Sequence, residues 1–150
     1  MQPTTVPAPS HAEAYAAVRV LDAYTAMRAA EVRAYAAPAQ PHRDLTRSAT
    51  GQALTGIAQT LLFYRRQGIV VRGHPHIRPR VTAVDLTVRP WTATIADCFD
   101  SDGWRPVLAA TGQPVSVPAQ RERYPVVASV RMVAGRWMVD RLNADRSRPC

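Results

Sequence analysis

One carboxylate and a few aromatic side chains are the residues of this sequence best suited to chemistry. Asp85 lies in an otherwise apolar run, VTAVDLTV, where burial would raise its carboxyl pKa toward the range of a general acid or base. The alternation of Val84, Asp85 and Leu86 instead places the carboxylate opposite the apolar side chains. We therefore expect Asp85 on the solvated face, and we identify no complete catalytic set.

Two patterns resemble metal sites but are incomplete. His74 and His76 lie two residues apart, so both imidazoles share one face of a strand, yet no third or fourth ligand lies nearby in the sequence. A run of acidic residues looks like a calcium loop without the final Glu of an EF-hand. We therefore expect the two histidines to lie in a surface loop and the acidic residues in a solvated turn. We expect neither a metal nor a cofactor. The acidic residues are Asp97, Asp100 and Asp102.

The positive charge is unevenly distributed. The 150 residues carry a net charge of +8, and every basic residue is Arg, as expected from a gene with GC-rich codons. Residues 43–80 hold seven Arg and one Asp, beside an acidic strip at 81–102. Such a basic surface can face an anionic partner, whereas the missing nucleic-acid motifs argue against DNA or RNA. Its members are Arg43, Arg47, Arg65, Arg66, Arg72, Arg78 and Arg80.

The two cysteines, Cys98 and Cys150, leave the redox setting open. They would be free thiols in a reducing compartment and could form one disulfide outside it. Residues 1–10 form a flexible lead rich in Pro and Thr, without the charged start and apolar run of a secretion signal. No apolar stretch approaches the roughly 20 residues that cross a bilayer.

Hydrophobic periodicity predicts helices first and strands afterwards. Ser10 and Glu13 have capping-box spacing, and the helix that follows ends before Pro38. A short turn spans 44–48, where Asp44 is the expected cap, and a second long helix covers 51–67, ended by Gly68. Its predicted buried face is Leu54, Ile57, Ala58, Leu61 and Leu62. The predicted strands are 69–72, 80–88, 91–99, 104–110, 123–133 and 136–142.

This order indicates an α+β fold, a single domain over residues 11–150 with helices on one face of a curved antiparallel sheet. It resembles the cone-shaped nuclear transport factor 2-like family. The sequence is more closely similar to small secreted or lipid-anchored proteins of Streptomyces and related actinobacteria. The stretches that carry the resemblance are AYA at 34–36, ATGQAL at 49–54, QGIVVRGHP at 67–75, VTAVDL at 81–86, ATIADC at 93–98, GRWMV at 135–139 and the terminal Cys.

The resemblance implies a pocket in the mouth of the cone and an extracellular or cell-envelope setting. In that setting a Cys98–Cys150 disulfide would tie the C-terminal tail to the sheet, for about 4 kcal/mol of chain-entropy stabilisation. The pocket is expected to hold an apolar small molecule. Its expected lining is Tyr24, Met27, Leu61, Tyr64, Trp91, Trp104, Arg131 and Trp137.

Three functions are compatible with these features. The favoured one is a non-catalytic binding or protein-interaction module of the cell envelope, with a partner protein bound through the sheet or a homodimer. The second is a cyclase, isomerase or dehydratase acting on a hydrophobic molecule in the cone; a cone plugged by Tyr24, Met27 and Trp137 would argue against it. The third is an assembly domain of a conjugation or secretion channel.

Overall fold

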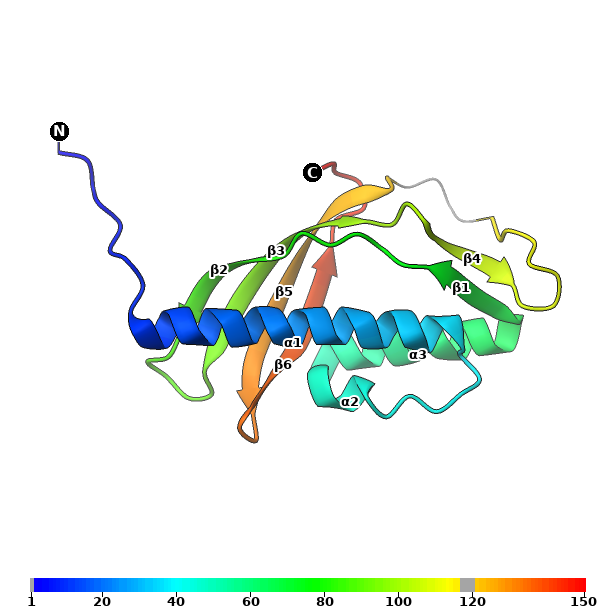
Figure 1. Cartoon of the computed structure of the whole chain (residues 1–150), viewed down its shortest axis with the longest axis horizontal. Helices are drawn as coiled ribbons and strands as arrows, with labels where there is room; N and C mark the ends of the chain where they lie inside the picture. The colour runs from blue at the N-terminus through cyan, green and yellow to red at the C-terminus, as the bar shows by residue number, and fades with distance from the viewer. Residues whose placement is uncertain (1, 117–120) are drawn as a thin grey trace.

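The first helix begins and ends where the sequence predicts. The computed structural model describes residues 2–116 and 121–150. α1 (His11–Ala36) begins after Ser10, whose Oγ accepts the backbone N–H of Glu13 at 3.1 Å, and it ends just before Pro38. Residues 2–10 are exposed and carry no helix or strand (Figure 1). α1 is the longest element and runs along most of the molecule.

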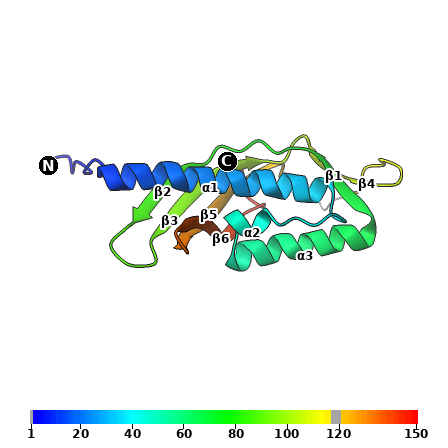
Figure 2. The ribbon, with the colours of Figure 1, turned by 60° about the horizontal axis from the view of Figure 1, so that its bottom comes forward.

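Two further helices follow α1. α2 (Leu45–Ser48) is short, and Asp44 does not cap it; its carboxylate instead pairs with Arg33 at 2.6 Å. α3 (Gly51–Gln67) runs alongside the C-terminal half of α1 (Figure 2) and ends at Gly68, which adopts the left-handed conformation. Gly51 has φ +54°, and a Cβ there would overlap the Asp140 carboxylate, so only glycine fits the start of α3.

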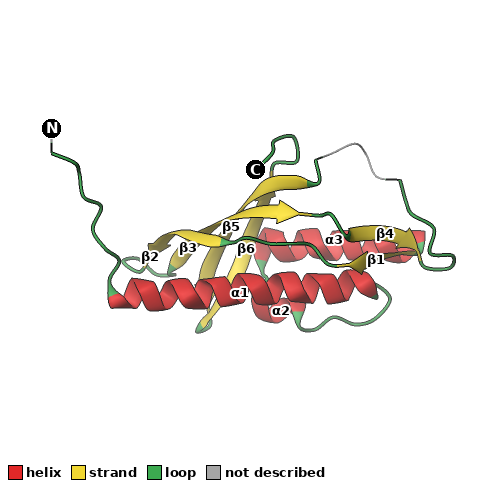
Figure 3. Cartoon of the chain, turned by 45° about the horizontal axis from the view of Figure 1, so that its top comes forward, coloured by secondary structure: helices red, strands yellow, loops and turns green. Residues whose placement is uncertain are grey.

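The strands form two antiparallel sheets, where the sequence predicts one. β2 (Arg80–Asp85), β3 (Thr92–Asp100), β5 (Arg123–Val133) and β6 (Arg136–Ala144) form a four-stranded sheet in that order, and β1 (Ile69–Gly73) pairs with β4 (Trp104–Leu108). Figure 3 shows the small sheet beyond the end of the large one. The division arises at 101–103, where a turn carries the chain from β3 to pair with β1 instead of continuing the large sheet.

The main core lies between α1 and the inner face of the four-stranded sheet. Val20, Tyr24 and Met27 of α1 are fully buried, and Ile95 and Val139 are buried opposite them on β3 and β6. Each such side chain contributes roughly 1.5–3 kcal/mol of hydrophobic stabilisation. The α+β architecture, with helices packed on antiparallel sheets, is therefore confirmed.

The inner face of α3 is narrower than predicted. Ala53, Ile57 and Leu61, at four-residue steps, are buried, whereas Ala58 and Leu62 are exposed. The reason is that α3 contacts the edge of the large sheet along a single stripe. Gln52 marks that contact, because its side-chain amide donates to Leu142 O at 3.2 Å and accepts from Leu142 N at 2.8 Å.

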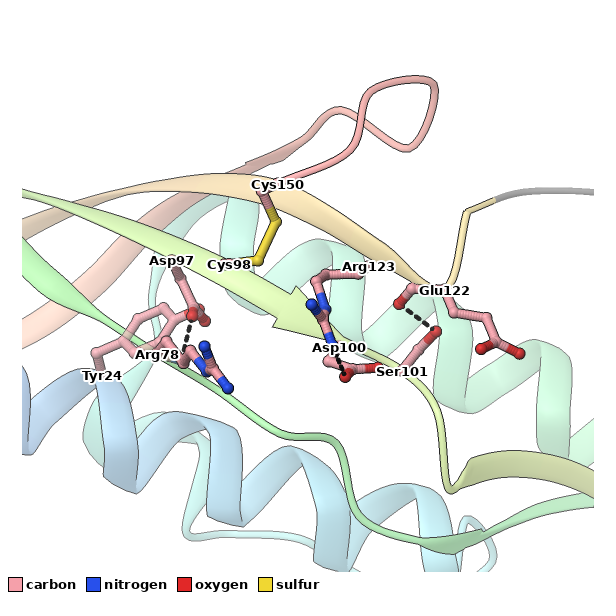
Figure 4. Close-up of a disulfide and its surroundings, with 9 residues drawn as sticks. All are labelled: Tyr24, Arg78, Asp97, Cys98, Asp100, Ser101, Glu122, Arg123 and Cys150. Atoms are coloured by element: carbon pink, nitrogen blue, oxygen red, sulfur yellow. Dashed lines mark hydrogen bonds and ion pairs between the residues drawn. A yellow bond between two sulfur atoms is a disulfide. The ribbon is translucent and has the colours of Figure 1, made fainter.

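The Cys98–Cys150 disulfide is present, as predicted (Figure 4). Cys98 lies on β3, and the two Cα atoms are 5.8 Å apart. The bond holds residues 145–150 against the large sheet, where Asp145 N also donates to Pro125 O at 3.0 Å. Among the residues that the structure describes, no helix has the length and apolar composition required to cross a membrane.

Candidate functional site

A cavity of about 660 Å³ opens at the end of the molecule where α1, α3 and the two sheets diverge. Its size lies in the range of small-molecule sites. The buried part of its lining comes from α1, α3, β1, β3 and β5, and exposed side chains from β4, the loop before β5 and the C-terminal tail surround its mouth.

Five aromatic residues line one side of the cavity. Tyr35 stacks on Trp104 with ring centroids 5.7 Å apart, and Tyr64 of α3 meets the Tyr35 ring edge-on at 5.3 Å. Phe99 contacts Trp104 at 5.9 Å and Tyr124 at 5.5 Å. These spacings are those of attractive aromatic pairs, so each ring restricts its neighbours. The cavity therefore has a continuous aromatic wall, formed by Tyr35, Tyr64, Phe99, Trp104 and Tyr124.

A buried ion pair also lines the cavity. Arg28 Nη1 lies 2.8 Å from Glu31 Oε1, and both residues are at most 7% exposed. The Arg28 guanidinium lies over the Phe99 ring, 4.4 Å from its centroid, and its Nε donates to Tyr24 Oη at 3.1 Å. Buried charges need such partners, because an unpaired charge in the interior is very costly.

The hydrogen bonds continue from Arg28 into the core. Tyr24 Oη donates to Asp97 Oδ2 at 2.5 Å, and Asp97 Oδ1 accepts the Arg78 backbone N–H at 2.6 Å (Figure 4). Asp97 is only 4% exposed, so its placement in a solvated acidic turn was wrong. The physical reason is the alternation of β3, which turns Asp97 inward with Ile95 and Phe99.

Burial fixes the protonation of several groups around this network. It raises the pKa values of Tyr24 and Tyr35 above the ordinary value of a tyrosine; at Tyr24 the Arg28 charge opposes this rise and Asp97 adds to it. Burial also raises the pKa of Tyr64, with Glu31 adding to the rise and Arg146 opposing it. At Arg28 burial works to lower the pKa, but Glu31 and Tyr24 outweigh it and the net shift is upward. These phenols stay protonated and the guanidinium stays charged near neutral pH.

Sequence reasoning missed Arg28 and Glu31. Arg28 follows Tyr24 by four residues and Glu31 by seven, which places both on the buried face of α1. The spacing was therefore a usable signal. Charged residues at the positions of a buried helix face indicate a buried ion pair.

The structure separates the eight predicted lining residues. Tyr64 and Trp104 line the cavity. Tyr24, Met27 and Leu61 belong instead to the main hydrophobic core, in which all three are buried. The remaining three lie elsewhere: Trp91 is half-buried beside Arg89, Arg131 lies 3.4 Å from Asp140, and Trp137 lines a second groove of about 390 Å³ between α1, α2 and the β5–β6 turn.

Asp85 lies on the exposed side, as the alternation of its strand predicts. Its Oδ1 accepts the N–H of Thr87 at 2.9 Å and the Thr87 hydroxyl at 2.6 Å. These hydrogen bonds lower the carboxyl pKa, which is opposite to the upward shift that a buried acid would show. Asp85 is outside the cavity lining, so it does not supply a carboxylate to this site.

The predicted basic surface consists of exposed side chains on several elements. All seven arginines are exposed. None of them lines the larger cavity, and Arg47 lines the smaller groove. Arg65 also forms a hydrogen bond, because its guanidinium donates to Pro38 O at 2.9 Å.

The imidazole rings of His74 and His76 lie with their centroids 5.5 Å apart. The described residues contain no cluster of three metal-ligating side chains.

Comparisons with known proteins inform on the fold alone. No family model matches the chain, and no curated protein matches it either. Among solved structures, the chain is similar to the intermembrane space region of the chloroplast protein ARC6, with a TM-score of 0.52 and 12% identity. The match covers 94% of this chain and 100% of that chain. At this identity the similarity supports the α+β architecture and carries no function.

Proposed function

We propose that this domain is a non-catalytic binding module of the cell envelope, with a nuclear transport factor 2-like cone whose cavity takes a small hydrophobic ligand. The observation that carries the proposal is the cavity of about 660 Å³ with its aromatic wall and buried Arg28–Glu31 pair. Rings supply apolar contact area, and a few fixed polar groups orient a ligand, as small-molecule sites require.

The state of the buried polar groups favours binding over proton transfer. Burial raises the pKa values of Tyr24 and Tyr35 above the ordinary value of a tyrosine, and Arg28 stays charged. Both Asp97 oxygens already accept hydrogen bonds, and Asp97 lies outside the cavity lining. A general acid or base needs a pKa near the working pH and access to the substrate. Tyr24 and Met27 also support the proposal, because both are buried in the packed core and neither borders the cavity.

The disulfide supports the cell-envelope setting. Disulfides persist in oxidising environments and are rare where glutathione and thioredoxin keep thiols reduced. The Cys98–Cys150 bond has an ordinary Cα separation of 5.8 Å, so the fold accommodates it. It agrees with the resemblance to secreted and lipid-anchored proteins.

A fragment titration followed by NMR tests the proposal. Small aromatic and alicyclic compounds are titrated into the ¹⁵N-labelled oxidised protein, and we expect shift changes at Tyr35, Tyr64, Trp104 and Tyr124. Val20 and Met27 in the packed core serve as internal controls. Shift changes confined to other surfaces would overturn the proposal. So would turnover of a bound fragment that Asp97→Asn abolishes, because it would favour the enzyme alternative.

A further inference from the structure

Among the residues that the structure describes, the lining of the cavity includes one charged side chain without an ion-pair partner. The lining contains three arginines and two glutamates, Arg28, Arg105, Arg146, Glu31 and Glu122. Glu31 pairs with Arg28 at 2.8 Å, and Arg105 lies 2.9 Å from Asp102 and 3.4 Å from Glu122. Within the described part of the chain, Arg146 has no carboxylate within ion-pair distance.

Arg146 lies against the aromatic wall. Its guanidinium lies over the Tyr124 ring at 5.4 Å from the centroid, which leaves the charge at the edge of the cavity. Its charge also opposes the rise of the Tyr64 pKa, so it acts on a side chain of α3 as well. An anion inside the cavity would therefore meet an aromatic wall and a cation together.

The tail that carries Arg146 is fixed at both ends. Asp145 N donates to Pro125 O at 3.0 Å on one side of Arg146, and the Cys98–Cys150 disulfide closes the other side. Arg121 Nε donates to Ser147 O at 3.3 Å between them. Because the backbone on both sides is held, less conformational entropy is lost when Arg146 meets a ligand.

We propose that the cavity selects small aromatic carboxylates, with the ring against the aromatic wall and the carboxylate toward Arg146. This inference rests on the proposed function, because it names the ligand class of the same cavity. Arg146 is the residue that distinguishes an anion from a neutral molecule of the same shape. The disulfide-held tail keeps that residue at the mouth.

Three probes of one shape separate charge from ring contact: 1-naphthoate, the neutral 1-naphthalenemethanol and the cationic 1-naphthylmethylammonium. Dissociation constants are measured by NMR titration at low salt, with wild type, Arg146→Gln and Arg148→Gln. Arg148 is the matched control, because it lies in the same tail, pairs with Asp145 at 3.7 Å and is outside the cavity lining. Both substitutions remove one positive charge from exposed positions.

We expect wild type to bind 1-naphthoate about fivefold more tightly than the alcohol, with the ammonium weakest. Arg146→Gln should bring the naphthoate affinity down to that of the alcohol and leave the alcohol unchanged, while Arg148→Gln should change neither. Equal binding of the three probes, or equal effects of the two substitutions, would overturn the selectivity and leave the proposed function standing. Absence of cavity binding by every probe would overturn both.

Discussion

Two consecutive stretches of α1, residues 20–27 and 28–35, face different interiors. Between residues 20 and 27, Val20, Tyr24 and Met27 are fully buried in the main core. Between residues 28 and 35, Arg28, Glu31 and Tyr35 border the cavity, whose lining also comes from α3, β1 and β4. One helix with one periodicity thus serves a packed core and a hollow site. The difference shows that the partner elements, and not the helix, decide whether its inner face fills space or lines it.

The largest expected effect concerns the Cys98–Cys150 disulfide, which holds the C-terminal tail beside the cavity. Replacing both cysteines, with Cys98→Ala and Cys150→Ala, should lower the free energy of unfolding by about 4 kcal/mol, because the bond closes a loop between residues 52 apart in sequence. Denaturant unfolding without reductant measures the loss. Wild type unfolded with dithiothreitol is the control and should approach the variant. A loss below about 1 kcal/mol would show that the tail is held by its other contacts.

The next effect concerns the buried Arg28–Glu31 ion pair in the lining of the cavity. Arg28→Met should cost about 3 kcal/mol, because Glu31 would remain buried without its partner. The double variant Arg28→Met, Glu31→Leu should recover most of that loss, and the coupling follows from a double-mutant cycle. A single variant as stable as wild type would contradict the burial of the pair.

A smaller effect is the difference in stability loss between one truncation in the packed core and one beside the cavity. Met27→Ala in the packed core should cost about 3 kcal/mol, since it opens a new void. Ile57→Ala, equally buried but bordering the cavity, should cost about 2 kcal/mol, because open space already lies beside it. Urea unfolding of both variants gives the difference. Equal losses would indicate that the cavity closes around the shortened side chain.

The smallest effect lies on the surface between α1 and α2. Hydrogen bonds from Arg33 lower the pKa of Asp44, so the carboxylate stabilises the fold above its unfolded pKa, and this contribution disappears as the pH falls through the folded value. Asp44→Asn should therefore cost only about 0.5 kcal/mol at pH 7, since the pair is exposed and screened by water. At pH 2 it should cost nothing. A larger loss at pH 2 than at pH 7 would contradict a stabilising role of the ionised Asp44 carboxylate.

Local order was well predicted from the sequence. Ser10, Pro38 and Gly68 affect only the backbone within a few residues of themselves, so the helix ends that we predicted from them are correct. The strands predicted at 123–133 and 136–142 form the β5–β6 hairpin, which turns at Ala134 and Gly135, both with positive φ. The disulfide also agrees with the prediction, although its basis was the resemblance and not the spacing of the two cysteines.

The site was not predicted, because it depends on which elements meet. Trp104 and Tyr64 line the cavity as predicted. Tyr24 and Met27 instead face the packed core, and the sequence does not show where along α1 the core ends and the cavity begins. Asp97 and Glu31 were missed for different reasons. The partner of Asp97 is Tyr24, which lies 73 residues away in the sequence, so only the fold brings the two together. The partner of Glu31 is Arg28 on the same helix, and that spacing was visible in the sequence.

Filling the cavity tests the central claim, that the hollow end is a binding site, most directly. Gly56 lies on the cavity side of α3, and no atom lies within 4 Å of a Cβ placed there. Gly56→Trp should therefore fold without loss of stability and weaken 1-naphthoate binding by about tenfold or more, because the new ring occupies the ligand's space. Ala58→Trp, on the exposed side of α3, is the matched control and should bind as wild type does. Unchanged 1-naphthoate affinity in a folded Gly56→Trp variant would contradict the claim.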